Sequence, residues 1–121
     1  MRPTERASLS IRMRFADGAR IGPGKIALLE GIARTGSIAG AGREMGMSYR
    51  RAWLLVDAVN AMFDEPVVST AAGGASGGGS ALTPLGEALV SAYRRIERDA
   101  EASVDRHFSA LAARIRSVDQ S

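Results

Sequence analysis

The residues best suited to bind a ligand lie in one short segment, Ser48–Arg51, of sequence Ser-Tyr-Arg-Arg. The segment follows Gly46-Met47 and opens an apolar pattern of helical spacing, so Ser48 is expected to cap a helix. Such a cap leaves first-turn backbone N–H groups available for a phosphate. Tyr49 can stack on a sugar or hydrogen-bond a phosphate, and the two guanidinium groups can read guanine through O6 and N7 or clamp phosphate. The segment therefore predicts that the start of a helix contacts nucleic acid.

The residues around this segment allow more than one interpretation. Arg43 and Lys25 are further candidates for phosphate contacts. For Arg50 and Arg51 the alternative is an ordinary solvated helix face. Trp53 lies beside the expected buried face of the helix, so packing is favoured over the alternative of contact with DNA.

The composition excludes several kinds of functional site. The chain has 121 residues, no cysteine and one histidine, which rules out a disulfide framework and a Cys- or His-rich metal site. The carboxylates Asp57, Asp64 and Glu65 have no histidine or cysteine beside them and are interpreted as surface charges. The glycine-rich run lacks the Lys-Ser/Thr ending of a phosphate-binding loop. We therefore expect no enzyme activity, no metal and no cofactor.

The charges are unevenly distributed along the chain. Residues 1–51 carry ten basic groups against four carboxylates, whereas residues 52–121 carry six against nine. This asymmetry predicts a polyanion partner for the first half and a protein-facing role for the second. Fifteen of the sixteen basic residues are arginine, which suits bidentate phosphate recognition but equally fits a GC-rich genome. The polar N-terminus and the absence of a long apolar run predict a cytoplasmic protein.

Hydrophobic spacing predicts a strand, a turn and three short helices in the first half of the chain. Residues 8–15 alternate strictly, as a half-buried strand does, and Asp17-Gly18 is a turn signal. Helices are expected over about 23–34, 38–45 and 48–63, punctuated by Gly36, a Ser37 cap and a left-handed Gly46. The positions expected to point inward are Leu9, Ile11, Met13 and Phe15 in the strand, Ile26, Leu28, Leu29, Ile32 and Ala33 in the first helix, Ile38, Ala41 and Met45 in the second, and Ala52, Leu55 or Val56, Val59 and Phe63 in the third.

A β-hairpin is expected directly after the third helix. Val67–Thr70 and Ala81-Leu82 would be its strands, and the Gly/Ser-rich stretch 73–80 would form its tip. The alternative is an interdomain linker. The hairpin is favoured because the stretch is short and Thr83-Pro84 starts the next helix at once.

The last part of the chain predicts one long helix, from Pro84 to about Val118. Its apolar or small residues recur every three or four positions, with Ala92 and Ala100 among them. A helix of ~35 residues is ~50 Å long at ~1.5 Å per residue, which is more than the preceding body can cover. We therefore expect a homodimer whose seam contains Leu89, Ile96, Val104, Phe108, Leu111 and Ile115.

Several blocks resemble the N-terminal domain of ModE-type molybdate-responsive transcription regulators, which is related to LysR-type DNA-binding domains. They are 22–30 (Gly-Pro-Gly-Lys-Ile-Ala-Leu-Leu-Glu), 35–38 (Thr-Gly-Ser-Ile), 46–53 (Gly-Met-Ser-Tyr-Arg-Arg-Ala-Trp), 65–68 (Glu-Pro-Val-Val) and 82–86 (Leu-Thr-Pro-Leu-Gly). The resemblance implies a mainly α fold with a small β component: a winged helix-turn-helix over 1–82 and a long dimerisation helix over 83–121. It also implies a bacterial regulator that binds double-stranded DNA through Ser48–Trp53.

Two departures from this family change the expectation. The resemblance covers about residues 8–98, with no molybdate-binding domain after it, so we expect a stand-alone form that does not bind molybdate by itself. The tip of the hairpin has no charge, which weakens its predicted contacts with phosphate. The competing hypothesis is a protein-interaction module that uses the long helix and carries a vestigial helix-turn-helix.

Overall fold

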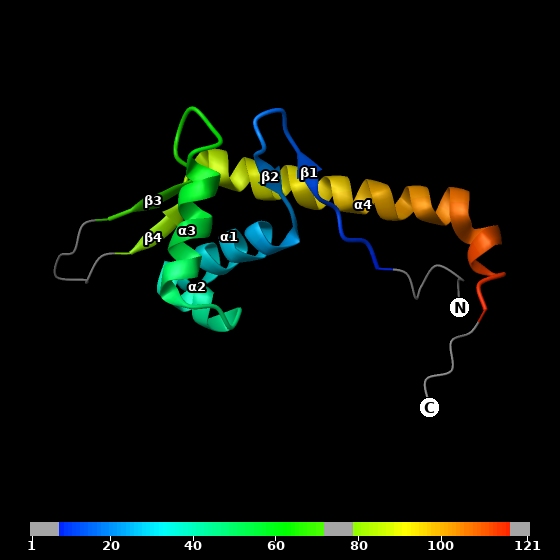
Figure 1. The fold of residues 1–121 in the computed structure, drawn as a ribbon, viewed down its shortest axis with the longest axis horizontal. Helices are drawn as coiled ribbons and strands as arrows, with labels where there is room; N and C mark the ends of the chain where they lie inside the picture. Colours follow the sequence, from blue (N-terminus) through cyan, green and yellow to red (C-terminus); the bar gives the residue numbers. More distant parts are fainter. Residues whose placement is uncertain (1–7, 72–78, 117–121) are drawn as a thin grey trace. The chain divides into compact units, whose positions relative to one another are not determined.

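The computed structural model describes residues 8–71 and 79–116 and is mainly helical with a small β part. The elements, in chain order, are β1 (Met13–Arg14), β2 (Arg20–Ile21), α1 (Pro23–Thr35), α2 (Ile38–Glu44), α3 (Tyr49–Asn60), β3 (Val68–Thr70), β4 (Ser80–Leu82) and α4 (Pro84–Ala112) (Figure 1). Ser10–Tyr93 form one compact unit, and the part of α4 from Arg94 belongs to a second. In the described part of the chain, every helix is too short or too polar to cross a membrane.

The first strand is much shorter than the predicted strand over 8–15. Only Met13 and Arg14 pair with β2, and the chain turns at Gly18, where φ is 85°. The alternation is present up to Met13, but Phe15 is 50% exposed instead of pointing inward. Phe15 N donates to Ala19 O at 2.9 Å, so this residue already belongs to the turn and its side chain leaves the core.

Helix α1 begins and ends where the sequence predicts. Pro23 occupies its first turn, and Gly36 ends it in the left-handed conformation with φ of 73°. Ile26, Leu29 and Ile32 are fully buried. Leu28, which widens the predicted stripe, is also buried, but Ala33 is exposed, contrary to prediction.

Helix α2 packs closely against both of its neighbours. The Ser37 hydroxyl accepts from Gly40 N at 2.9 Å, which confirms the predicted cap. Ile38 and Ala41 are buried, but Met45 is 37% exposed, because it lies at the C-cap after the helical face has turned away. A Cβ on Gly42 would lie 3.1 Å from Ala52 Cβ. Small residues therefore allow the close approach of α2 and α3.

Helix α3 is shorter than expected, ending at Asn60 instead of Phe63. Ala52, Val56 and Val59 are buried, so Val56 and not Leu55 occupies the inward position. Phe63 lies past the helix end and is half-buried.

The predicted hairpin after α3 is confirmed. Strands β3 and β4 are antiparallel, with Val68 opposite Leu82 and Thr70 opposite Ser80. The Gly/Ser stretch therefore joins two paired strands, which contradicts the linker alternative. Most of its expected tip, residues 73–78 of 73–80, lies outside the described residues.

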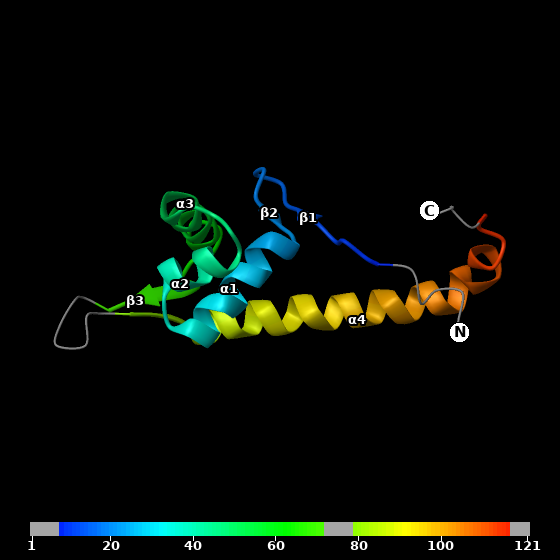
Figure 2. The same ribbon diagram turned by 90° about the horizontal axis from the view of Figure 1, so that it is seen from below.

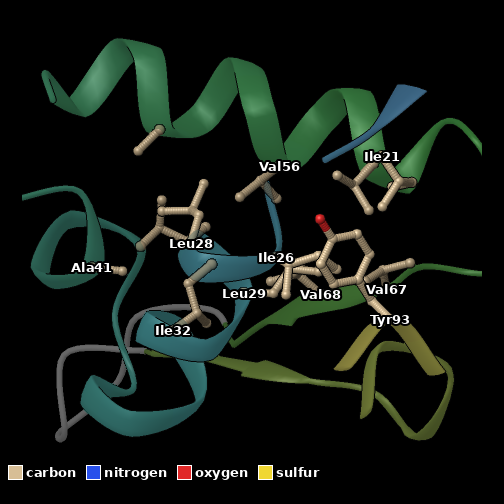
Figure 3. Packing of buried hydrophobic residues seen from close by; sticks show 13 residues of the cluster. Ile21, Ile26, Leu28, Leu29, Ile32, Ala41, Val56, Val67, Val68 and Tyr93 are labelled. Atoms are coloured by element: carbon tan, nitrogen blue, oxygen red, sulfur yellow. The ribbon is translucent and has the colours of Figure 1, made fainter. Parts of the chain in front are cut away.

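The start of α4 completes the core of the Ser10–Tyr93 unit. Thr83 Oγ accepts from Gly86 N at 3.1 Å and so caps the helix. Tyr93, not the predicted Ala92, is buried, and its hydroxyl donates to Ile11 O at 2.6 Å. Figure 3 shows Tyr93 packed among the aliphatic side chains of α1, α3 and β3. The helix ends at Ala112, short of the predicted end near Val118, which lies outside the described residues.

Candidate nucleic-acid interface

The turn between α2 and α3 fixes the start of α3. Gly46 has φ of 71°, a conformation that favours glycine. Met47 N donates to Gly42 O at 3.0 Å, which closes the turn onto the end of α2. The glycine at 46 is therefore required by the backbone path that connects the two helices.

The capping of α3 leaves a polar, electropositive helix terminus. Ser48 Oγ accepts from Arg51 N at 3.1 Å, while the amides of Tyr49 and Arg50 have no acceptor within the helix itself. The first turn contains no acidic residue. The positive end of the helix dipole is thus not opposed by a local carboxylate, which favours an anionic ligand.

The side chains of this first turn are presented to solvent. Tyr49 is 59% exposed, and Arg50 and Arg51 are exposed with no ion pair to any described residue. Trp53 is half-buried against the core and meets Tyr49 edge to face, with ring centroids 6.1 Å apart. The two rings form a short aromatic ridge beside the two guanidinium groups.

Arg43 and Lys25 lie in different surroundings. Arg43 is exposed in the last turn of α2, close in sequence to the turn before α3. Lys25 is half-buried at the start of α1, and its Nζ donates to Arg20 O at 2.7 Å. Burial lowers the pKa of Lys25 from its ordinary value, and the charge of Arg20 lowers it further. The Lys25 side chain is therefore bonded to the β1–β2 hairpin.

Asn60 is a positioning residue that the sequence analysis missed. Its Oδ1 accepts from Val67 N at 2.7 Å and Val68 N at 3.0 Å, so the end of α3 holds the start of β3 (Figure 1). Ser80 N donates to Gly36 O at 2.9 Å, which ties β4 to the end of α1. No hydrophobic pattern marks these bonds, because they depend on the fold bringing α3 and the hairpin together.

The residues expected at a dimer seam have mixed exposure. Leu89 and Val104 are half-buried. Ile96, Phe108 and Leu111 are between 39% and 57% exposed on α4, and Ile115, at 64%, lies beyond the end of the helix. Large apolar side chains are thus left open to solvent along the part of α4 that follows Tyr93.

Comparison with known proteins agrees with the resemblance found in the sequence. No protein-family model matches the chain. Over 80 residues it is 54% identical to the molybdenum-pterin-binding protein MopB of Rhodobacter capsulatus, covering 66% of this chain and 30% of that protein. Over 79 residues it is 38% identical to the DNA-binding transcriptional dual regulator ModE of Escherichia coli (strain K12), covering 65% and 28%.

The chain is a homologue of the ModE and Mop proteins. It spans about a third of the length of these curated relatives, since the shares covered lie between 27% and 34%. The predicted relation to ModE-type regulators is therefore confirmed. The winged helix-turn-helix, the stand-alone form and the roles of the individual site residues stay predictions.

Proposed function

We propose that this chain is a DNA-binding transcription regulator that acts as a homodimer in the cytoplasm. In this proposal α2 and α3 are a helix-turn-helix, the β3–β4 hairpin is its wing, and α3 enters the major groove with its N-terminal turn. The names of the ModE relatives, which include "Transcriptional regulator ModE" and "DNA-binding transcriptional dual regulator ModE", support it.

The first turn of α3 is the observation that carries the proposal. It combines a side-chain cap, exposed Tyr49, Arg50 and Arg51, and no acidic residue. A protein uses such a turn for charge-assisted bonds to phosphate and for bidentate bonds to guanine. We assign base readout to Arg50, phosphate contacts to Tyr49, Arg51 and Arg43, and packing beneath Tyr49 to Trp53.

The domain division proposed for this function places DNA binding in residues 1–82 and dimerisation in 83–121. Exposed Ile96, Phe108 and Leu111 support an apolar seam on α4. Two-fold symmetry would then set two copies of α3 about one DNA turn, ~34 Å, or a multiple of it, apart. Sedimentation of Phe108→Asp with Leu111→Asp tests this division. A dimer like the wild type would contradict it.

Binding to duplex DNA tests the proposal as a whole. Arg50→Ala should weaken binding to an operator selected from random duplexes by about 1–3 kcal/mol while leaving the circular dichroism spectrum unchanged. Arg114→Ala, which removes an exposed arginine outside the ModE-like segment, is the matched control. Equal operator affinity of wild type and Arg50→Ala would remove Arg50 from base readout.

The competing function is a protein-interaction module that works through α4. The uncharged β3–β4 hairpin and the exposed apolar residues of α4 favour it. A salt titration with random duplex DNA separates the two. A steep fall of affinity with salt shows phosphate neutralisation, whereas no binding at low salt favours the interaction module.

Molybdenum binding is suggested only by the names of the Mop relatives, of which this chain covers 30% and 34%. We expect no tight molybdate site in this chain. The hollow of about 430 Å³ that α1, β4 and α4 line contains two carboxylates, Glu30 and Glu87, and one cation, Arg34, which already pairs with Glu44. This lining does not favour a dianion. Calorimetry that detects a stoichiometric, sub-micromolar molybdate site would overturn this expectation.

A further inference from the structure

The β1–β2 hairpin and the start of α1 form a basic cluster that the α3 site does not use. The cluster consists of Arg12, Arg14, Arg20 and Lys25, and Asp17 in the turn is the only carboxylate in residues 8–25. The three arginines are exposed and make no ion pair with any described residue. Their charges are therefore not neutralised within the described part of the chain.

The strand register forces these charges together. Arg14 is the direct cross-strand partner of Arg20, an arrangement that is unfavourable for like charges. Arg12 precedes Arg14 by two residues, which places it on the same face of the strand segment. Its Nε lies 3.7 Å from where a Cβ on Gly22 would stand, so its side chain runs along the start of α1.

The half-buried Lys25 adds a fourth cation beside Arg20. Its Nζ is held on Arg20 O, and its pKa is lowered by burial and by Arg20. A folded protein that keeps four cations this close, against their repulsion, offers a surface suited to a polyanion.

The hairpin lies on the same side of the core as α3. In Figure 2, α3 and the turn of β1–β2 lie above α1, whereas the N-terminal part of α4 lies below it. Figure 3 shows Ile21 of β2 packed beneath α3. Figure 1 shows the turn of β1–β2 on the side of the end of α3 that leads to β3, away from the first turn of α3. A duplex that lies along α3 would thus meet this second cationic surface beyond the C-terminal end of the helix.

We infer that the β1–β2 hairpin, through Arg12, Arg14 and Arg20, binds the phosphate backbone of the duplex whose major groove α3 enters. This inference rests on the proposed DNA-binding function and adds a contact to it. The hairpin supplies charge that the β3–β4 hairpin lacks, since residues 67–82 contain no charged side chain. Phosphate contacts of this kind fix the register of the protein on the duplex and add affinity, but they do not distinguish one base sequence from another.

The salt dependence of binding measures this contact. For Arg14→Gln with Arg20→Gln, the slope of log Kobs against log[salt] should become shallower by about two, because each phosphate contact contributes about 0.9. Between 50 and 200 mM salt the loss of affinity should then be about tenfold smaller than in the wild type. Discrimination between operator and random duplex should stay unchanged. Arg95→Gln with Arg98→Gln, which removes the same charge from α4, is the control.

A tethered chemical nuclease locates the contact on the DNA. Because the chain has no cysteine, Ala16→Cys in the hairpin turn can be labelled uniquely with an iron chelate. We expect cleavage of the backbone outside the base pairs protected by α3, and none from a label at Ser91→Cys on α4.

Each outcome separates this inference from the proposed function. If the wild type shows no salt-dependent DNA binding, both are overturned. If it binds, but the Arg14/Arg20 variant keeps the wild-type slope or the control variant loses as much, only the hairpin contact is overturned. Absence of cleavage from residue 16, with the operator still protected, likewise overturns the hairpin contact alone.

Discussion

The two β-hairpins of this chain are stabilised in opposite ways. The β3–β4 hairpin is uncharged and is held to three helices by specific polar bonds, from Asn60 of α3, Gly36 at the end of α1 and Thr83 before α4. The β1–β2 hairpin has only two residue pairs, and one of them opposes two arginines. The hairpin that comes first in the chain thus carries charge, and the second positions its neighbouring helices.

This difference indicates which property matters most in each hairpin. A hairpin that positions neighbouring helices needs satisfied backbone groups and close contacts, because a buried unsatisfied group is costly. A hairpin that contacts a polyanion tolerates unfavourable repulsion that its ligand relieves on binding. We therefore expect substitutions in the β3–β4 region to change folding, and substitutions in the β1–β2 region to change binding more than folding.

The largest effect is expected at the junction of β3 with α4. A Cβ on Gly86 would lie 2.3 Å from Val67 O, a backbone atom that cannot move without shifting β3. Gly86→Ala should lower the free energy of unfolding by about 2–3 kcal/mol through overpacking. Gly24→Ala is the matched control, since nothing lies within 4 Å of its Cβ position and alanine favours helix. Urea unfolding at one protein concentration measures both, and an unchanged midpoint for Gly86→Ala would contradict the close contact.

The next effect is expected at the bond between α3 and β3. Asn60→Ala leaves the amides of Val67 and Val68 without their acceptor, which should cost about 1–3 kcal/mol of unfolding free energy. Asn60→Asp keeps the Oδ1 acceptor and should recover much of the loss. Operator affinity should fall in Asn60→Ala only as far as the folded fraction falls. Equal stability of the alanine and aspartate variants would show that Oδ1 does not hold the hairpin.

Local signals explain which elements could be predicted from the sequence. The caps at Ser37 and Ser48 and the left-handed glycines at 36 and 46 act within a few residues, so the sequence predicts the helix starts and turns correctly. The exposed first turn of α3 follows from the same short-range rules. Its role in binding DNA stays a prediction, because no local rule identifies a ligand.

Tertiary contacts explain what the sequence could not provide. The prediction that Ala92 lies in the buried stripe of α4 is wrong. Tyr93 is buried instead, because a tyrosine can be buried when its hydroxyl finds a partner, here Ile11 O. That partner lies 82 residues away along the chain. The prediction that Met45 and Phe15 point inward is wrong for a related reason. Helix and strand spacing hold only inside an element, and both residues lie outside one. The basic cluster likewise needed the β1–β2 register, which sequence spacing alone does not give.

The smallest expected change has the opposite sign and separates the two hairpins most sharply. Arg14→Thr with Arg20→Thr replaces a repulsive cross-strand pair by residues that favour strands, which should raise the free energy of unfolding by about 0.2–1 kcal/mol. The same variant should lose DNA affinity uniformly across sequences, because it removes cations and no base contact. Thermal unfolding at fixed protein concentration measures the stability of this variant. A salt titration of DNA binding with the same protein measures its affinity. A variant that is less stable than the wild type would show that the two arginines serve the fold, and the contrast between a charged hairpin and a structural one would not hold.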